Sequence, residues 1–215
     1  MRIRITASVF GVGAVFLLAG CSGGETGSAA PPKSSVDPAG SSSGRANGQA
    51  LPYAGAPKVA EPLSSSVLSS GPCAALTPQQ VKTALGVDAQ GRSDTLPGIG
   101  PKCIWDNLER GAKVTVYYVT ETGRGLSGLY ENTKPQAAVW KPLPGIQGFP
   151  AVAYVASTGG DPREFCAVSV GIADNLTVET AVSLGESKIG KADPCAIAPK
   201  EADAVVTTLR AKAGA

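Results

Sequence analysis

The sequence predicts an α+β fold, in which an antiparallel β-sheet has helices packed on one face and two disulfides link the elements. Residues 71–215 show a helix pattern, several strand patterns close together along the chain, and a final helix pattern, an order typical of this class. The same stretch contains four cysteines. Its length of about 145 residues suits one domain with one hydrophobic core.

The N-terminus has the layout of a bacterial secretory signal. Two arginines precede an apolar run over residues 6–18, which at 13 residues is shorter than the roughly 20 that span a bilayer. Residues 18–21, Leu-Ala-Gly-Cys, resemble a lipobox, where bacteria cleave a prolipoprotein before the cysteine and attach lipid, such as palmitate, to its thiol. We therefore expect a signal peptide over residues 1–20 and a mature chain anchored through Cys21 to the extracytoplasmic face of the cell membrane. An uncleaved membrane helix is the alternative.

A segment of low complexity follows Cys21. Residues 22–70 contain Ser, Ala, Gly or Pro at 33 of 49 positions and show no hydrophobic periodicity. Such a composition buries too little apolar surface to offset the entropy lost on ordering. We therefore expect residues 21–70 to form a disordered tether. Its few large apolar residues either make weak local contacts or dock on the domain: Tyr53, Leu63, Val67 and Leu68.

The charge of the domain argues against some classes of partner. Residues 71–215 hold 14 Lys or Arg and 14 Asp or Glu, so their formal net charge is zero, and they contain no basic run. Domains that bind nucleic acid usually carry a basic patch, so we expect no nucleic acid partner. The membrane contact that we expect is the lipid on Cys21.

The four cysteines of the domain predict two disulfides, because exported domains form disulfides in an oxidising compartment. A metal site is disfavoured, since the chain has no His and no C-x-x-C pair. Three connectivities are possible. We favour Cys73–Cys103 and Cys166–Cys195, because each pair would join the start of a helix to a strand.

Both helix starts share a motif. The Pro-Cys-Ala sequences at 72–74 and 194–196 each precede a second proline that can open a helix. Thr77 and Gln80 fit a capping box for the first helix, and Gly86 suits its end.

The second helix contains a proline early in its sequence. Pro199 lacks the N–H that a helix interior needs, so we expect this helix to start at about Ala198.

Strands are expected between the helices. Residues 112–120 are rich in β-branched and aromatic residues, and Trp105 follows Cys103 on a strand that we expect to face the core. A short helix is predicted over 125–133 and an irregular, proline-rich loop over 142–150. The other predicted strands cover residues 137–141, 151–157, 164–171 and 176–184.

The search for catalytic groups gives no assignment. Without His, the Ser-His-Asp and Cys-His arrangements are excluded. Residues 125–128, Gly-Leu-Ser-Gly, are one residue short of a nucleophile elbow. Two carboxylate pairs, Asp106 with Glu109 and Asp161 with Glu164, are typical of solvated turns. We therefore predict no catalytic residue, no cofactor and no metal.

The best candidate for a binding surface is the proline-rich loop and the tryptophan before it, because binding residues concentrate on loops. The predicted binding rim consists of Trp140, Leu143, Ile146 and Phe149.

Taken together, these motifs resemble a known family. The resemblance covers about residues 71–210 and rests on the lipobox, the tether and the ordered motifs Pro72-Cys73 with Leu76, Leu85-Gly86, Cys103-x-Trp105, Cys166 and Asp193-Pro194-Cys195. The chain is similar to actinobacterial lipoproteins of domain-of-unknown-function family 3558. The resemblance implies an envelope lipoprotein with a small disulfide-linked domain, and it supplies no catalytic residues. Pro199 departs from what we expect of the family.

Two functions follow as hypotheses. The first is a non-catalytic module of the cell envelope that binds an unidentified ligand or protein. The alternative is a secreted hydrolase that uses Asp and Glu or a Ser–Lys pair. The neutral surface and the lack of catalytic motifs favour the binding module.

Overall fold

A computed structural model describes residues 45–46 and 48–214 of the chain. The expected signal peptide and Cys21 lie outside the described residues, so the lipid anchor stays a prediction. Within the described residues, no helix combines the length and the apolar character needed to cross a bilayer.

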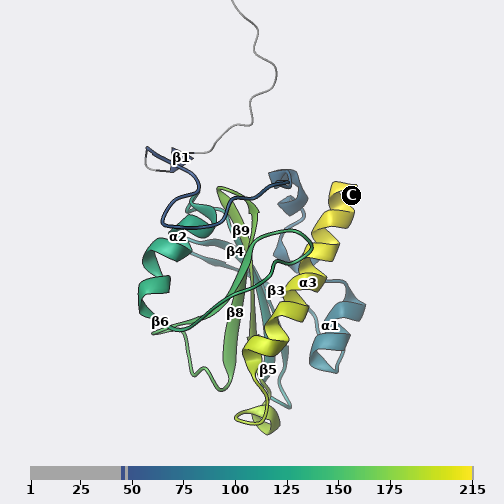
Figure 1. The fold of residues 1–215 in the computed structure, drawn as a ribbon. Helices are drawn as coiled ribbons and strands as arrows, with labels where there is room; N and C mark the ends of the chain where they lie inside the picture. The colour runs from purple at the N-terminus through teal and green to yellow at the C-terminus, as the bar shows by residue number, and fades with distance from the viewer. Residues whose placement is uncertain (1–44, 47, 215) are drawn as a thin grey trace, which may run out of the picture. The chain divides into compact units, whose positions relative to one another are not determined.

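Seven antiparallel strands form the main sheet (Figure 1). Their order is β3-β4-β5-β9-β8-β7-β6, so β9 lies at the centre of the sheet although it is the last strand in the chain. The predicted α+β class with an antiparallel sheet is confirmed. The strands are β3 (Arg92–Leu96), β4 (Gly100–Asn107), β5 (Ala112–Val119), β6 (Ala137–Pro142), β7 (Ala151–Ala156), β8 (Phe165–Ala173) and β9 (Leu176–Ser183), and a small pair, β1 (Arg45–Ala46) and β2 (Gln49–Ala50), precedes them.

The two faces of the sheet are covered differently. Helices α1 (Pro78–Leu85) and α3 (Pro194–Ala213) lie on one face, as expected, and enclose the main core there (Figure 1). Helix α2 (Gly125–Asn132) lies against the opposite face, where Leu129 packs on a smaller apolar cluster that includes Tyr154. The sheet therefore forms a layer between α2 and the other two helices.

Local signals place α1 as predicted. The Thr77 hydroxyl accepts a hydrogen bond from the backbone N–H of Gln80 at 3.3 Å, and the Gln80 side chain accepts one from the N–H of Thr77 at 2.7 Å. The helix ends at Gly86, whose φ of 73° is in the left-handed region that glycine adopts without strain. The capping box and the end of α1 are confirmed.

Helix α3 begins four residues before the expected start at Ala198. The Asp193 carboxylate accepts a hydrogen bond from the N–H of Cys195 at 2.8 Å, and Pro194 occupies the first helical position. These two residues start the helix early enough for Pro199 to lie inside it. The prediction that Pro199 delays the helix was wrong, because Asp193 caps the helix at a position upstream of Pro199.

Both favoured disulfides are present. Cys73, in a short 3₁₀ helix before α1, is bonded to Cys103 on β4, with a Cα–Cα distance of 5.0 Å. Cys166 on β8 is bonded to Cys195 in the first turn of α3, with a Cα–Cα distance of 5.1 Å. Each bond joins the start of a helix to a strand, as the sequence indicated, and Trp105 is buried beside Cys103 in the main core.

The expected boundary between tether and domain at residue 71 differs from the structure. Residues 48–70, which we call the N-terminal strap, are ordered on the domain, and four of their apolar side chains are buried. The low-complexity composition suggested disorder, but these side chains are spaced to contact a surface rather than to form a core of their own. They are Leu51, Val59, Val67 and Leu68.

Backbone hydrogen bonds fix the strap at three places. Its first part is bonded to α2, where the N–H of Tyr53 donates to the Ser127 hydroxyl at 2.9 Å. The N–H of Val59 donates to the Asp174 carboxylate at 2.8 Å, in the β8–β9 turn. The N–H of Leu63 donates to a carbonyl of β8 at 2.8 Å. The strap therefore runs from α2 past the end of β8, and its last residues contact α3.

Candidate functional site

The predicted binding rim does not form one surface. Ile146 and Phe149 are each only 6% exposed and belong to the main core, against which Leu143 also packs. Trp140 lies with the smaller cluster, and its ring meets Tyr130 edge-on at 5.0 Å. The four residues therefore do not form the exposed rim that we expected, because the loop turns Ile146 and Phe149 inward and Gln147 hydrogen-bonds to α3.

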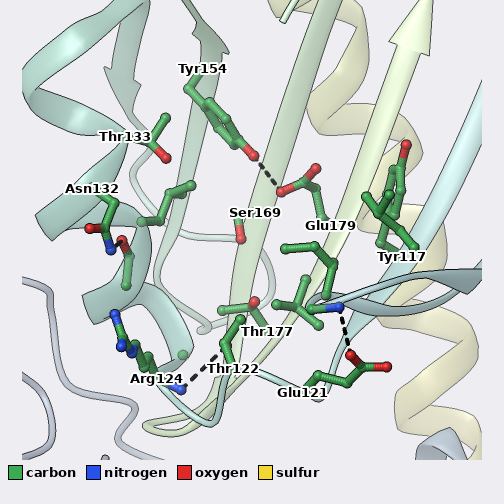
Figure 2. Close-up of a pocket in the computed structure, with 17 residues that line it drawn as sticks. Tyr117, Glu121, Thr122, Arg124, Asn132, Thr133, Tyr154, Ser169, Thr177 and Glu179 are labelled. Atoms are coloured by element: carbon green, nitrogen blue, oxygen red, sulfur yellow. Dashed lines mark hydrogen bonds between the residues drawn. The ribbon is translucent and has the colours of Figure 1, made fainter. Parts of the chain in front are cut away.

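An open groove of about 650 Å³ lies instead between α2 and the sheet (Figure 2). The segment from Glu121 to Thr133 forms one wall, the β3–β4 turn forms another, and strands β5, β7, β8 and β9 contribute the floor. Among the polar side chains that line it are Glu121, Thr122, Arg124, Asn132, Ser169, Thr177 and Glu179.

Two glycines make the walls of the groove possible. Gly125 starts α2 with a φ of 51°, and a Cβ there would lie 2.1 Å from the carbonyl oxygen of Asp174. Gly100 ends the β3–β4 turn with a φ of 133°, and its Cβ would lie 2.3 Å from the carbonyl oxygen of Tyr118. A side chain at either position would push its wall away from the sheet, so both walls depend on a glycine whose backbone lies too close to a neighbouring carbonyl for a Cβ.

The most unusual residue of the groove is Glu179. It lies near the middle of β9, with Tyr117 directly opposite on β5 and Ser169 directly opposite on β8. Glutamate is depleted in strands, and here it occupies the central strand of the sheet on the face toward α2. Figure 2 shows its carboxylate between Tyr154 and Tyr117.

Burial dominates the electrostatics at Glu179. The Tyr154 hydroxyl donates a hydrogen bond of 2.5 Å to the Glu179 carboxylate. Burial raises the pKa of Glu179, and this hydrogen bond opposes the rise. Burial is also the main reason why the pKa of Tyr154 lies well above its usual value and that of Tyr117 is raised, with the charge of Glu179 adding to both shifts.

The charged groups at the edge of the groove have partners of their own. The Arg124 guanidinium lies 3.5 Å from the Glu131 carboxylate. The Glu121 carboxylate accepts a hydrogen bond of 2.7 Å from the N–H of Gly98 and so holds the β3–β4 turn (Figure 2). Lys102 is paired with Asp94 at 3.0 Å.

Two of the acids and the serine that the sequence analysis considered have structural roles. Asp106 is paired with Arg92, and Asp161 is paired with Arg163, which lowers the pKa of Asp161 to about 2. Ser127 is fully buried and accepts the bond from the strap, so it is not a free nucleophile. In the part of the chain that the structure describes, no three acidic or cysteine side chains group closely enough to hold a metal ion.

Sequence reasoning missed Glu179, although a signal was present. The segment Val178-Glu179-Thr180-Ala181-Val182 places one charged residue inside a predicted strand that is otherwise uncharged and largely apolar. A carboxylate in such a position is rare unless it has a partner or a function.

The family model described as "Protein of unknown function (DUF3558)" matches residues 16–208. The chain belongs to the DUF3558 family. Comparison with curated proteins gives no match, and comparison with solved structures gives none either.

The DUF3558 match includes every residue of the groove and both disulfides. The resemblance noted from the cysteine and proline motifs is thus confirmed at the level of the family. The family description carries no activity, so the function of this DUF3558 protein has to be argued from the groove itself.

Proposed function

We propose that this DUF3558 protein is a lipid-anchored, extracytoplasmic binding module whose ligand occupies the groove between α2 and the sheet. The observation that carries the proposal is a partly buried carboxylate, Glu179, in the floor of an open groove of about 650 Å³. Ligand sites are typically concave, mostly preformed, and lined by apolar groups with a few placed polar ones. The groove has this composition, with Leu129 and Val119 beside Ser169 and Glu179.

A binding role is favoured over the hydrolase alternative. Hydrolysis by carboxylates needs a second acid poised to act with the first. The other groove carboxylate, Glu121, accepts a backbone hydrogen bond from Gly98, and Ser127 is occupied by the strap. Glu179 is therefore the one groove carboxylate without a structural role, and a single such acid suits ligand recognition better than acid–base catalysis.

Two features support an extracytoplasmic location at a membrane. The two disulfides join core elements and are typical of proteins that mature outside the reducing cytoplasm. The Leu-Ala-Gly-Cys sequence at residues 18–21 suits lipidation at Cys21. Bacterial lipid anchors need more than one acyl chain for stable attachment.

We expect Cys21→Ser to abolish the anchor. Without the thiol that accepts the lipid, the protein should leave the membrane fraction or accumulate unprocessed, and it should incorporate no radiolabelled palmitate. Cell fractionation and metabolic labelling measure this directly. Lipid incorporation equal to that of the unmodified chain would refute the assignment.

We expect Asn132→Trp to block the groove. Asn132 is exposed and lines the groove, so a tryptophan there fills the cavity without entering the core. Ligand-observed NMR with a fragment library should then show weakened binding, by about tenfold or more for ligands that fill the cavity.

The matched control is Leu108→Trp, at a position that is 87% exposed in the turn after β4 and does not line the groove. The control should bind the same fragments as the unmodified chain. Equal binding by both tryptophan variants, or no fragment binding at all, would show that the groove is not a binding site.

A further inference from the structure

We propose that the groove selects ligands that carry an ammonium group, with the cation placed on Glu179 between Tyr117 and Tyr154. This inference rests on the proposed binding function and names the chemistry of its ligand. Three features of the described residues support it: a carboxylate without a cationic partner, two aromatic rings beside it, and nearby cations that are already paired.

The first feature is the position of the carboxylate. Glu179 lies on the central strand, and its neighbours across the sheet are Tyr117 and Ser169, neither of which carries a positive charge. Among residues 48–214, no Lys or Arg forms an ion pair with it, and Tyr154 donates its hydrogen bond to one carboxylate oxygen. Buried carboxylates are normally paired, so an unpaired one in a groove leaves room for a cation from outside.

The second feature is the aromatic surroundings. Tyr117 and Tyr154 both line the groove, on either side of Glu179 (Figure 2). Ammonium groups bind favourably over aromatic faces, and the Glu179 carboxylate would add Coulomb attraction to the same cation. A neutral ligand would gain the ring contacts but would leave the carboxylate without a counter-charge.

The third feature is that the cations near the groove are engaged elsewhere. Lys102 lies 5.9 Å from the centre of the Tyr117 ring but is paired with Asp94 at 3.0 Å. Arg124 is paired with Glu131 at 3.5 Å. With two carboxylates, Glu121 and Glu179, and one paired guanidinium, the lining favours a positive ligand over an anion.

The buried carboxylate of Glu179 also lowers the stability of the fold when it is charged, and a bound cation would offset this loss. Burial raises the pKa of this carboxyl above its unfolded value, so its contribution to stability is full at low pH and is lost as the pH rises through the raised pKa. In its charged form the carboxylate therefore destabilises the fold. Residues that reduce stability in this way concentrate at binding and catalytic sites.

The test uses the full chain in non-ionic detergent and ligand-observed NMR with two matched probes, 2-phenylethylamine and its neutral analogue 2-phenylethanol. We expect the amine to bind more tightly than the alcohol. Glu179→Gln keeps a hydrogen-bond acceptor for Tyr154 and removes the charge, so it should weaken amine binding by about 10- to 100-fold and leave alcohol binding unchanged.

The matched control is Glu109→Gln, which removes the same charge from an exposed turn outside the groove. It should bind the amine as the unmodified chain does. Thermal melting checks that the Glu179→Gln variant is folded when its binding is compared. This variant should melt at a higher temperature than the unmodified chain at neutral pH, and the gain should shrink as the pH falls.

Amine affinity should also fall as the pH is lowered through the raised pKa of Glu179. The titratable groups beside Glu179 are Tyr117 on β5 and Tyr154 on β7, and burial raises the pKa of both. Arg124 and Glu121 are the other charged side chains that line the groove. The pH profile of Glu179→Gln measures how much groups other than Glu179 contribute to this fall in affinity.

Equal binding of amine and alcohol, unchanged amine affinity in Glu179→Gln, or no amine binding at millimolar concentration would each overturn the inference. The proposed function fails separately. If other fragments still bind and Asn132→Trp weakens them, the groove is a binding site for ligands of another class. If no fragment binds, the binding function itself is refuted.

Discussion

Replacement of Cys166 and Cys195 together by alanine is expected to lower the free energy of unfolding by about 3.5 kcal/mol. The bond closes a loop with a sequence separation of 29 residues, and its loss restores that loop's freedom to the unfolded chain. Both cysteines belong to the main core, so alanine also removes some packing there. Denaturant unfolding of the oxidised proteins, monitored by circular dichroism, gives the difference.

The other disulfide provides the control for this result. The Cys73–Cys103 loop has a separation of 30 residues, so the chain-entropy argument predicts a loss of similar size when both cysteines become alanine. A loss below about 1 kcal/mol for the Cys166–Cys195 pair would contradict the expectation. It would mean that the core alone holds the start of α3 against β8.

Removal of the N-terminal strap is the second large effect. A chain that starts at residue 71 lacks four buried side chains, each worth roughly 1.5–3 kcal/mol when fully buried. It also leaves the Asp174 carboxylate and a β8 carbonyl without their backbone donors. We expect this chain to be destabilised by several kcal/mol relative to one that starts at residue 45, or not to fold.

A point variant keeps this prediction measurable if the shortened chain does not fold. Leu68→Ala in the full chain should cost about 2–5 kcal/mol, because Leu68 is 8% exposed and packs in the main core. Lys58→Ala, on an exposed side chain of the same strap, should change stability by less than about 0.5 kcal/mol. If both variants unfold at the same denaturant concentration, the strap does not contribute to the fold as the structure implies.

Local signals in the sequence were sufficient for most of the fold. The capping box of Thr77 and Gln80, the glycine after α1 and the β-rich run of β5 each act within a few residues, so they could be interpreted without knowledge of the rest of the chain. The disulfide pairing also followed from local context, because both helix starts carry the same Pro-Cys-Ala motif.

Features that depend on distant contacts were missed. Strand β3 (Arg92–Leu96) is exposed along its whole length and is held by pairing with β4. Its polar sequence gives no signal for a strand. The strap has no hydrophobic period, since it lies across a surface and does not form a regular element. The four residues of the predicted rim do not share one surface for a related reason: Ile146 and Phe149 pair with each other in a β-bridge and pack in the core.

The site was the least predictable part. The surroundings of Glu179 depend on strand order, because β9 lies beside both β5 and β8 only in the folded sheet. The two tyrosines beside it come from strands that are 37 residues apart in the chain, at Tyr117 and Tyr154. Such convergence has no signature in a single sequence beyond the presence of an isolated acid in an apolar strand.

The helices on the two faces of the sheet differ in how firmly they are held. Both disulfides lie on the side of α1 and α3, where they join helix starts to β4 and β8. Helix α2 contains no cysteine and is held by packing, by the strap and by close backbone contact at Gly125. Local opening draws on the least constrained parts of a protein, and amide exchange there is faster than in the core. The wall of the groove formed by α2 is therefore less constrained than the cross-linked half, and we expect it to open first when the protein begins to unfold.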